Sequence, residues 1–357
     1  MVTPAASPDS PPPRLRIAHV ILSQGFAGSE RSTVESCAAQ CAAHDVLLIV
    51  RRSHRSRSGA SIRDHLDPRV AVAEIPDRWF TRRRLEHVLR EWRVDVAHAH
   101  LRRATRLLAR CRLDVARVST LHLGINGPQF LEMDALVCIS PWQLDTIPKD
   151  YRGRAQLIRN SLVPHARLAP ERIAALRAGM GAAPGEFLIG GVGRLAHSKG
   201  WDVLLRAFAQ ASLPDARLAL IGEGRERARL QKLAGPRVRL LGFRPDAKDY
   251  YQAFDLFVCP SRREPMGRVI LEALDAGVPV VAADAAGPKE ILAEYPGELV
   301  PIGDVAALAA ALRRAWETRG ERREVDVSAH HLERVSGETI ALYREAIARR
   351  RARAPAI

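Results

Sequence analysis

Short apolar runs alternate with amphipathic stretches along most of the chain. In the first half, the apolar runs have the length of buried strands, and the stretches between them have the three-to-four-residue spacing of helices. Strands that alternate with helices form parallel sheets covered on both faces. The expected strands are 16–22, 45–50, 94–99, 117–120 and 135–139, and the expected helices are 30–43 and 81–92.

The same alternation restarts at residue 187, after the stretch 160–185, whose prolines and glycines indicate a linker. A last amphipathic stretch, 336–351, predicts a long helix that returns to the first domain, because its apolar positions need a surface to pack on. In the second half, the expected strands are 187–192, 217–221, 238–241, 256–258 and 278–282, and the expected helices are 199–211, 225–233 and 267–276.

These patterns predict an α/β protein of two Rossmann-like domains whose parallel sheets face each other across a cleft. We expect a first domain at 14–165, joined by the C-terminal helix 336–353, and a second domain at 166–335. Residues 1–13 contain five prolines and no apolar core, which predicts a disordered tail rather than a signal peptide. Ligands of open parallel sheets bind beyond the carboxyl ends of the strands, so the loops there are where site residues are expected.

Composition adds a preference for anionic partners. The 357 residues carry a formal net charge of +15, and arginine accounts for most of the excess. A GC-rich genome that encodes arginine in place of lysine is the alternative explanation. None of the five cysteines forms a Cys-x-x-Cys pair, and no run of about 20 apolar residues could span a membrane. We therefore expect a cytoplasmic protein with reduced thiols.

The first candidate site follows the strand 187–192. Glycines end this strand, Arg194 follows, and Lys199 stands five residues later at the start of a helix. Arginine offers paired donors to phosphate oxygens, lysine a mobile charge, and the helix N-terminus its free N–H groups. This combination indicates a diphosphate site, although two ordinary surface cations in a strand–helix loop would give the same sequence pattern.

The second candidate site is the segment Glu264-Pro265-Met266-Gly267, which leads into a helix that carries Glu272. Seven residues lie between the two glutamates. Carboxylates accept strong hydrogen bonds from the hydroxyls of a polyol, and Gly267 permits close approach of backbone to a ligand. Alone, the pair would be read as a solvated helix face; beside a diphosphate site it indicates recognition of a sugar and a ribose.

Together, these segments resemble glycosyltransferase family 4, whose members are retaining enzymes of the GT-B fold. The resemblance extends from about residue 14 to 320 and is strongest over 187–292. It lies in Val-Gly-Arg-Leu at 192–195, in Pro-Ser-Arg-Arg-Glu-Pro-Met-Gly at 260–267, and in Gly-Val-Pro-Val at 277–280. The loop Ala-Gly-Ser-Glu-Arg at 27–31 is similar to the family's Gly-Gly-x-Glu loop.

The resemblance implies a nucleotide-sugar donor and assigns roles to particular residues. Arg194 and Lys199 would bind the donor diphosphate, Glu272 the ribose, and Glu264 the sugar hydroxyls. The backbone around Met266 and Gly267 would assist Glu264.

The remaining roles fall on both domains. The backbone near Phe243 and Arg244 would meet the base, and Gly28 would approach the phosphates. His122 matches a histidine that lies near the reacting sugar in relatives, although a hydrogen-bonded residue that ends a strand is the alternative. The catalytic candidates are therefore His122, Glu264, Arg194 and Lys199, and His98 and His100 are weaker candidates.

Three positions depart from the family pattern. Ala27 replaces a glycine, which puts in doubt a backbone contact that needs positive φ; Met266 replaces a phenylalanine; and Ser161 replaces the glycine of the Asn-Gly at the domain exit. No Asp-x-Asp occurs in the sequence, so we expect no obligate metal, no cofactor, and two cations in the metal's place.

The expected reaction is transfer of a hexose from a UDP-sugar, or as second choice a GDP-sugar, to a saccharide or lipid-linked acceptor in lipopolysaccharide synthesis. Basic residues 82–84, with Trp79 and Phe80 beside them, suggest peripheral contact with the anionic inner membrane face; a solvated helix with its apolar side in the core is the alternative.

An epimerase or phosphorylase on the same fold stays open, because fold does not fix function. A basic nucleic-acid-binding protein lacks any motif that would support it, and we expect no nucleic-acid partner. A dinucleotide oxidoreductase would need a Gly-x-Gly-x-x-Gly after the first strand, which is absent.

Overall fold

The computed structural model describes residues 13–56, 59–319 and 321–353, so nearly all of the predicted tail at 1–13 lies outside the described residues. The chain divides into two compact units. Unit 1 comprises Met1–Ile139, Gln143–Ser161 and Leu332–Ile357, and unit 2 comprises Ser140–Trp142 and Leu162–His331. Among the described helices, none is long and apolar enough to cross a membrane.

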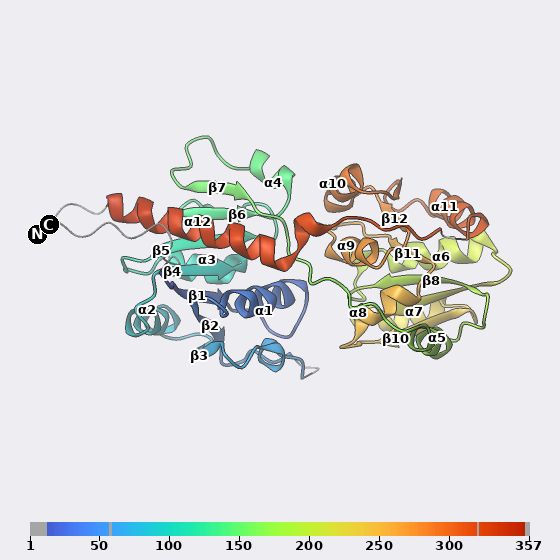
Figure 1. Cartoon of the computed structure of the whole chain (residues 1–357), viewed down its shortest axis with the longest axis horizontal. Coiled ribbons are helices and arrows are strands. Elements are labelled where there is room, and N and C mark those ends of the chain that lie inside the picture. The colour runs from blue at the N-terminus through green and yellow to red at the C-terminus, as the bar shows by residue number, and fades with distance from the viewer. Residues whose placement is uncertain (1–12, 57–58, 320, 354–357) are drawn as a thin grey trace, which may run out of the picture. The chain divides into compact units, whose positions relative to one another are not determined.

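Unit 1 is built on a seven-stranded parallel sheet of order β3-β2-β1-β4-β5-β6-β7 (Figure 1). The carboxyl ends of all its strands therefore meet at one edge. The strands are β1 (Arg16–Ile21), β2 (Asp45–Arg51), β3 (Ala71–Ile75), β4 (Val96–His100), β5 (Ala116–Leu121), β6 (Ala135–Cys138) and β7 (Arg154–Leu157).

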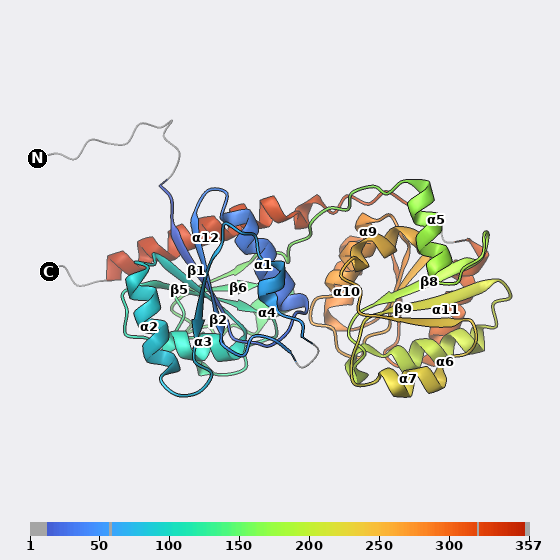
Figure 2. The ribbon, with the colours of Figure 1, turned by 90° about the horizontal axis from the view of Figure 1, so that it is seen from below.

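Helices cover both faces of this sheet (Figure 2). Alternate strand residues point to opposite faces: Ala18 packs in the core beneath α2 and α3, whereas Ile17 packs in the core beneath α12. The helices are α1 (Gly28–Gln40), α2 (Thr81–Glu91), α3 (Leu101–Ala109), α4 (Pro141–Asp145) and α12 (Leu332–Arg353), with 3-10 turns η1 (Ile62–His65) and η2 (Pro128–Phe130).

Unit 2 is built on a six-stranded parallel sheet of order β10-β9-β8-β11-β12-β13. The strands are β8 (Phe187–Val192), β9 (Ala216–Ile221), β10 (Val238–Gly242), β11 (Leu256–Cys259), β12 (Val280–Ala283) and β13 (Glu298–Val300). The helices are α5 (Pro170–Gly179), α6 (Trp201–Ala211), α7 (Arg227–Leu233), α8 (Ala247–Tyr250), α9 (Arg268–Asp275), α10 (Ala286–Glu294) and α11 (Val305–Glu317), with 3-10 turns η3 (His197–Lys199), η4 (Tyr251–Ala253) and η5 (Ser328–His330).

A single apolar core joins one face of this second sheet to α6 and α11. Leu204 and Leu312 are fully buried there beside Ile189 of the central strand β8. The opposite face carries Phe257, which contacts Tyr251 of η4 at 5.2 Å between ring centroids. Each unit thus has its own core.

Two sequence expectations about the connections need revision. The stretch predicted as a linker contains α5, because Pro170 stands at the first helical position, where proline favours a helix instead of breaking it. The final helix is longer than expected, starting at Leu332, and it packs on the sheet of unit 1, where Tyr343 is fully buried.

Candidate functional site

The predicted donor residues of unit 2 lie on loops that follow neighbouring strands. Arg194 follows β8, Phe243 and Arg244 follow β10, and Glu264 follows β11. Because these strands are parallel, all of these loops leave the same edge of the sheet. Arg194 is exposed, and its backbone oxygen accepts a hydrogen bond of 2.9 Å from Trp201 Nε1, which fixes the loop to α6.

Lys199 and Glu264 form an ion pair, although their loops are 65 positions apart in sequence. Both side chains are largely buried, with 21% and 10% of their surface exposed. Ser261 Oγ donates to the same carboxylate oxygen of Glu264 at 3.2 Å. The structure therefore brings together a predicted phosphate ligand and a predicted sugar ligand, each of which holds the other in place.

Glu272 lies on the second turn of α9 and is almost fully buried. Tyr251 donates from its hydroxyl to Glu272 Oε2 at 2.8 Å, and Arg268 Nε lies 3.4 Å from Oε1. A buried carboxylate needs such partners, because leaving water costs it several kcal/mol (a typical scale for buried ions). Glu272 is thus held rigidly, with its neighbours fixed by the core.

Backbone contacts with α10 fix the position of the segment 264–267. Gly287 N donates to Glu264 O at 3.0 Å, and a β-carbon on Gly287 would lie 2.3 Å from Cα of Met266. Gly267, with φ of +86°, turns the chain into α9 in a conformation that glycine adopts without strain. Close backbone contact therefore fixes the position of the predicted sugar-binding loop.

A second contact, between Arg262 and Asp202, holds the loop before Glu264 against α6. Arg262 donates two hydrogen bonds to Asp202, at 2.7 and 2.9 Å, and these hold the pKa of that carboxyl below its usual range. Asp202, Arg262, Ser261 and Tyr251 were not predicted from sequence. From the sequence, only the charges of Asp202 and Arg262 could have suggested a role for these residues. No sequence pattern pairs two residues that are 60 positions apart.

Two predicted residues of unit 1, Gly28 and His122, lie in segments that follow strands of its sheet. Gly28 is the first residue of α1, and Ala27 caps that helix with φ of −143°. This is extended backbone, which any residue adopts, so the substitution of glycine by Ala27 imposes no strain. His122 follows β5 and is half-buried, with Nε2 3.4 Å from Nδ1 of His100.

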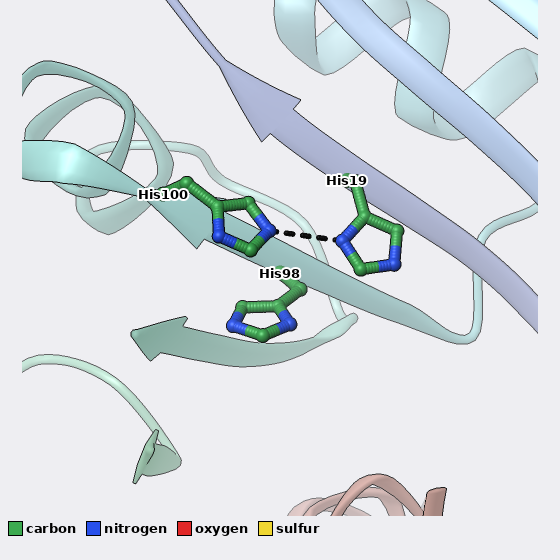
Figure 3. A group of neighbouring side chains, drawn as sticks. All are labelled: His19, His98 and His100. Atoms are coloured by element: carbon green, nitrogen blue, oxygen red, sulfur yellow. Dashed lines mark hydrogen bonds between the residues drawn. The ribbon is translucent and has the colours of Figure 1, made fainter. Parts of the chain in front are cut away.

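His19, His98 and His100 meet on one face of the first sheet (Figure 3). Nδ1 of His19 lies 2.9 Å from Nε2 of His100. The other ring nitrogen of His19 contacts Gln40 Oε1 at 2.8 Å. Together with His122, these rings form a continuous chain of contacts from Gln40 on α1 to the end of β5.

The ring nitrogens of three histidines are close enough, within 4.8 Å of one another, to be considered as metal ligands. His98, however, has both nitrogens engaged, with Tyr343 Oη at 2.5 Å and Thr120 Oγ1 at 2.7 Å. His19 is engaged on both nitrogens as well. The arrangement is that of a hydrogen-bonded network whose members satisfy each other.

Burial keeps this network neutral. It lowers the pKa of the His19 imidazole to about 4 and that of His122 also to about 4. Burial, together with repulsion from the neighbouring imidazoles, holds the pKa values of His98 and His100 well below 6.5. At neutral pH, His122 therefore offers a neutral ring, able to donate or accept one hydrogen bond but carrying no charge.

Comparison with known proteins extends over both units. A family model described as glycosyltransferase family 4 matches residues 26–162, and one described as glycosyl transferases group 1 matches residues 186–318. The lipopolysaccharide core biosynthesis glycosyltransferase LpsD of Rhizobium meliloti is 31% identical over 269 residues, which cover 72% of this chain and 74% of that protein.

Two further similarities are informative. A GDP-mannose-dependent alpha-mannosyltransferase of Mycobacterium tuberculosis is 37% identical over 123 residues, which cover 34% of this chain and 32% of that one. The crystal structure of Anabaena HepE in complex with UDP and glucose superimposes with a TM-score of 0.74 at 21% identity, covering 95% of this chain and all of the other. At that level of identity, the similarity supports the fold.

Proposed function

This chain belongs to glycosyltransferase family 4 and has the GT-B fold, and from that premise we propose that it transfers a sugar from a nucleoside-diphosphate sugar, with retention of anomeric configuration, to a saccharide or lipid-linked acceptor. The proposal places this reaction in lipopolysaccharide synthesis, because LpsD, its relative over most of the chain, has that role. The UDP complex of HepE favours a UDP-sugar donor, and the mycobacterial relative makes a GDP-sugar the second choice.

The observation that carries the proposal is the Lys199–Glu264 ion pair, which lies among the segments that follow the strands of unit 2. The proposed donor residues combine this pair with an exposed arginine, Arg194, and the buried Glu272. These residues offer positive charge for a diphosphate and two carboxylates for hydroxyls. Phe243, half exposed after β10, offers a flat apolar surface for a base.

In the proposed reaction, the bond between the anomeric carbon and the donor phosphate oxygen breaks, and the diphosphate leaves with the electron pair. Arg194, Lys199 and the N-terminus of α6 stabilise that charge; a well-placed donor of this kind contributes roughly 3–4 kcal/mol to the transition state. The acceptor hydroxyl attacks the same face and gives its proton to the departing phosphate oxygen. No nucleophilic side chain is required, and we propose no cofactor and no obligate metal.

From unit 1, the proposal includes His122 and Gly28 on the ground of the family resemblance alone. A neutral His122, with its pKa lowered to about 4, would hydrogen-bond a sugar hydroxyl without adding positive charge near an oxocarbenium-like state. Its Nε2 faces His100, which restrains the ring.

The test is thermal stabilisation by UDP-, GDP- and ADP-sugars in metal-free buffer, with nucleotide release followed in parallel. We expect selective stabilisation by one nucleotide class, lost in Arg194→Ala and Glu272→Ala. Arg206→Ala, which removes another exposed arginine of unit 2 from α6, is the matched control and should behave as the parent.

Contrary outcomes have distinct meanings. Equal loss of stabilisation in all three variants would refute the assignment of Arg194 and Glu272. Appearance of a new nucleotide sugar in the absence of acceptor would indicate an epimerase instead of a transferase.

We also propose peripheral contact with the anionic inner membrane face. The structure limits which side chains near α2 could contact lipid. The apolar side of α2 is not available for lipid, because Leu85, Val88 and Leu89 are buried in the core of unit 1. The exposed apolar side chains of this region are Trp79 and Phe80, which precede the helix.

A further inference from the structure

Five arginine side chains line one pocket of unit 1 at the carboxyl edge of its sheet. Its volume is about 460 Å³, in the range of small-molecule sites, and no acidic residue is among its lining. The loop after β3 and the first turn of α2 supply one wall, and α3 supplies the other. The lining residues are Arg78, Phe80, Thr81, Arg82, Arg83, Arg103, Arg106 and Leu107.

The walls of this arginine pocket are tied together by the arginines themselves. Arg103 donates to the backbone oxygen of Asp77, which fixes α3 to the loop before α2. Arg82 donates to the backbone oxygen of Arg110 at 3.1 Å. These two contacts join α2, α3 and the loop before α2 around the pocket.

Two acidic residues beside the pocket, Asp77 and Glu86, have contacts of their own. The carboxylate of Asp77 accepts from Ser53 Oγ at 2.6 Å and lies 3.4 Å from Arg51. Glu86 accepts from the backbone N–H of Arg112 at 2.9 Å and lies 3.6 Å from Arg82. The carboxylates of Asp77 and Glu86 thus lie beside the pocket with contacts of their own, and the pocket lining itself contains arginines but no acid.

A pocket lined by several positive charges favours an anionic ligand. Repulsion between guanidinium groups is strongest where water is partly excluded, as in a pocket. The first turn of α2 has no acidic residue, so the positive end of that helix adds to the field. Guanidinium groups bind phosphate oxygens through paired hydrogen bonds, which makes phosphate the anion best suited to this geometry.

Two exposed aromatic side chains adjoin the arginines. Trp79 is 80% exposed and Phe80, part of the pocket lining, is 70% exposed. Large aromatic residues beside a cationic pocket suit a ligand with an apolar part next to its anionic group, because the rings can enter the interface region of a lipid layer.

We propose that the arginine pocket binds the phosphate of an anionic amphiphile, with Trp79 and Phe80 holding the apolar part beside it. If this amphiphile is the acceptor of the proposed transfer reaction, the inference rests on the proposed function, and the acceptor is a phosphorylated molecule. The same chemistry is presented by the headgroup of an anionic phospholipid, and the two sources are separated by experiment.

The test uses the full chain and two triple variants that remove equal charge. The pocket variant is Arg78→Gln, Arg83→Gln and Arg106→Gln. The control variant changes Arg90, Arg102 and Arg112 to Gln; these are exposed arginines of unit 1 outside the pocket lining. Binding is measured at about 0.15 M salt, where screening acts over about 8 Å and limits the effect of distant charges.

The probes are vesicles of phosphatidylglycerol and phosphatidylcholine in equal parts, vesicles of phosphatidylcholine alone, and inorganic pyrophosphate in solution. We expect the pocket variant to bind the anionic vesicles at least tenfold more weakly than the control variant. A parallel loss with pyrophosphate would assign the site to the phosphate group alone, and a loss on vesicles only would assign it to a lipid-borne phosphate.

Equal weakening of the two variants would overturn the proposal, since diffuse charge would then explain the binding. So would absence of binding of the parent to every probe, or tighter binding of duplex DNA that is lost in the pocket variant. Thermal stabilisation by the donor, measured on the pocket variant, keeps this result separate from the proposed function: none of the three changed arginines is a proposed donor residue, so the stabilisation should stay as in the parent.

Discussion

At the scale of single residues, the proposed donor site depends on groups that hold its charged side chains in place. Tyr251 is fully buried and donates to Glu272 at 2.8 Å. Its loss would leave a buried carboxylate with fewer donors, and hydrogen bonds to charged groups typically contribute about 1.5–3 kcal/mol. We predict that Tyr251→Phe weakens donor binding by roughly tenfold or more, measured by calorimetric titration. Tyr250→Phe, the adjacent buried tyrosine, should leave binding within about twofold; equal effects would remove Tyr251 from this role.

The histidine network predicts a stability that falls in mild acid. Because the pKa of His19 is about 4 in the folded protein and 6.5 ordinarily, the unfolded chain takes up this proton first as pH falls. Stability therefore rises with pH across this window and is lost from about pH 6.5 down to about 4, by about 3 kcal/mol for His19 alone.

Urea unfolding at pH 7, 6, 5 and 4.5 tests whether stability falls as the pH falls and whether His19 causes the fall. His19→Gln should unfold more easily at pH 7 but show a shallower decline toward pH 4.5 than the parent. His87→Gln, which changes an exposed histidine of α2, should decline as steeply as the parent. Parallel declines of the parent and His19→Gln would contradict the role of His19.

At the scale of elements, the close approach of α10 to the loop 264–267 sets the shape of the sugar-binding candidate. A β-carbon on Gly287 would lie 2.3 Å from Cα of Met266, a backbone contact that no rotamer change can relieve. We predict that Gly287→Ala shifts this loop and lowers kcat/KM at least tenfold in the transfer assay. Gly179→Ala, at the end of α5 with nothing within 4 Å, should retain parental activity. Unchanged activity in Gly287→Ala would show that the contact is unimportant, and equal loss in both variants would show that the effect does not come from this contact.

The elements also show what sequence patterns can and cannot reveal. Central strands such as β1, β4 and β8 were predicted within about two residues, because strands buried on both faces form uninterrupted apolar runs. The edge strand β10 was predicted, but the edge strands β3, β7 and β13 were missed, since partly exposed edges carry charges such as Glu74 and Arg154 within short runs.

Site prediction had the same limit. Loops that follow predicted strands could be assigned to the sheet edge, and the pairing of Lys199 with Glu264 fits that placement. The contact of His98 with Tyr343 spans 245 positions, and the arginine pocket combines two elements, one of which, α3, the periodicity did not predict. Contacts of this kind are set by packing and carry no local signal.

At the scale of the whole molecule, the chain's last helix stabilises its first unit. Tyr343 of α12 is fully buried beside Val96 and Val118, and its hydroxyl contacts His98. Replacing a large buried aromatic by alanine costs roughly 3–5 kcal/mol through lost contacts and the cavity that remains. Tyr343→Ala should therefore destabilise unit 1, although unit 2 lies between it and the rest of that unit in sequence.

Hydrogen exchange can distinguish the two units because each has its own core. In Tyr343→Ala, we expect faster exchange in β1, β4 and β5 and unchanged exchange in β8 and β11. A UDP-sugar should slow exchange at 194–199 and 264–272 equally in the parent and the variant, since the donor candidates of unit 2 do not depend on Tyr343. Faster exchange throughout unit 2 in the variant would instead mean that the two cores unfold as one cooperative system, and the separation of donor binding from the stability of unit 1 would fail with it.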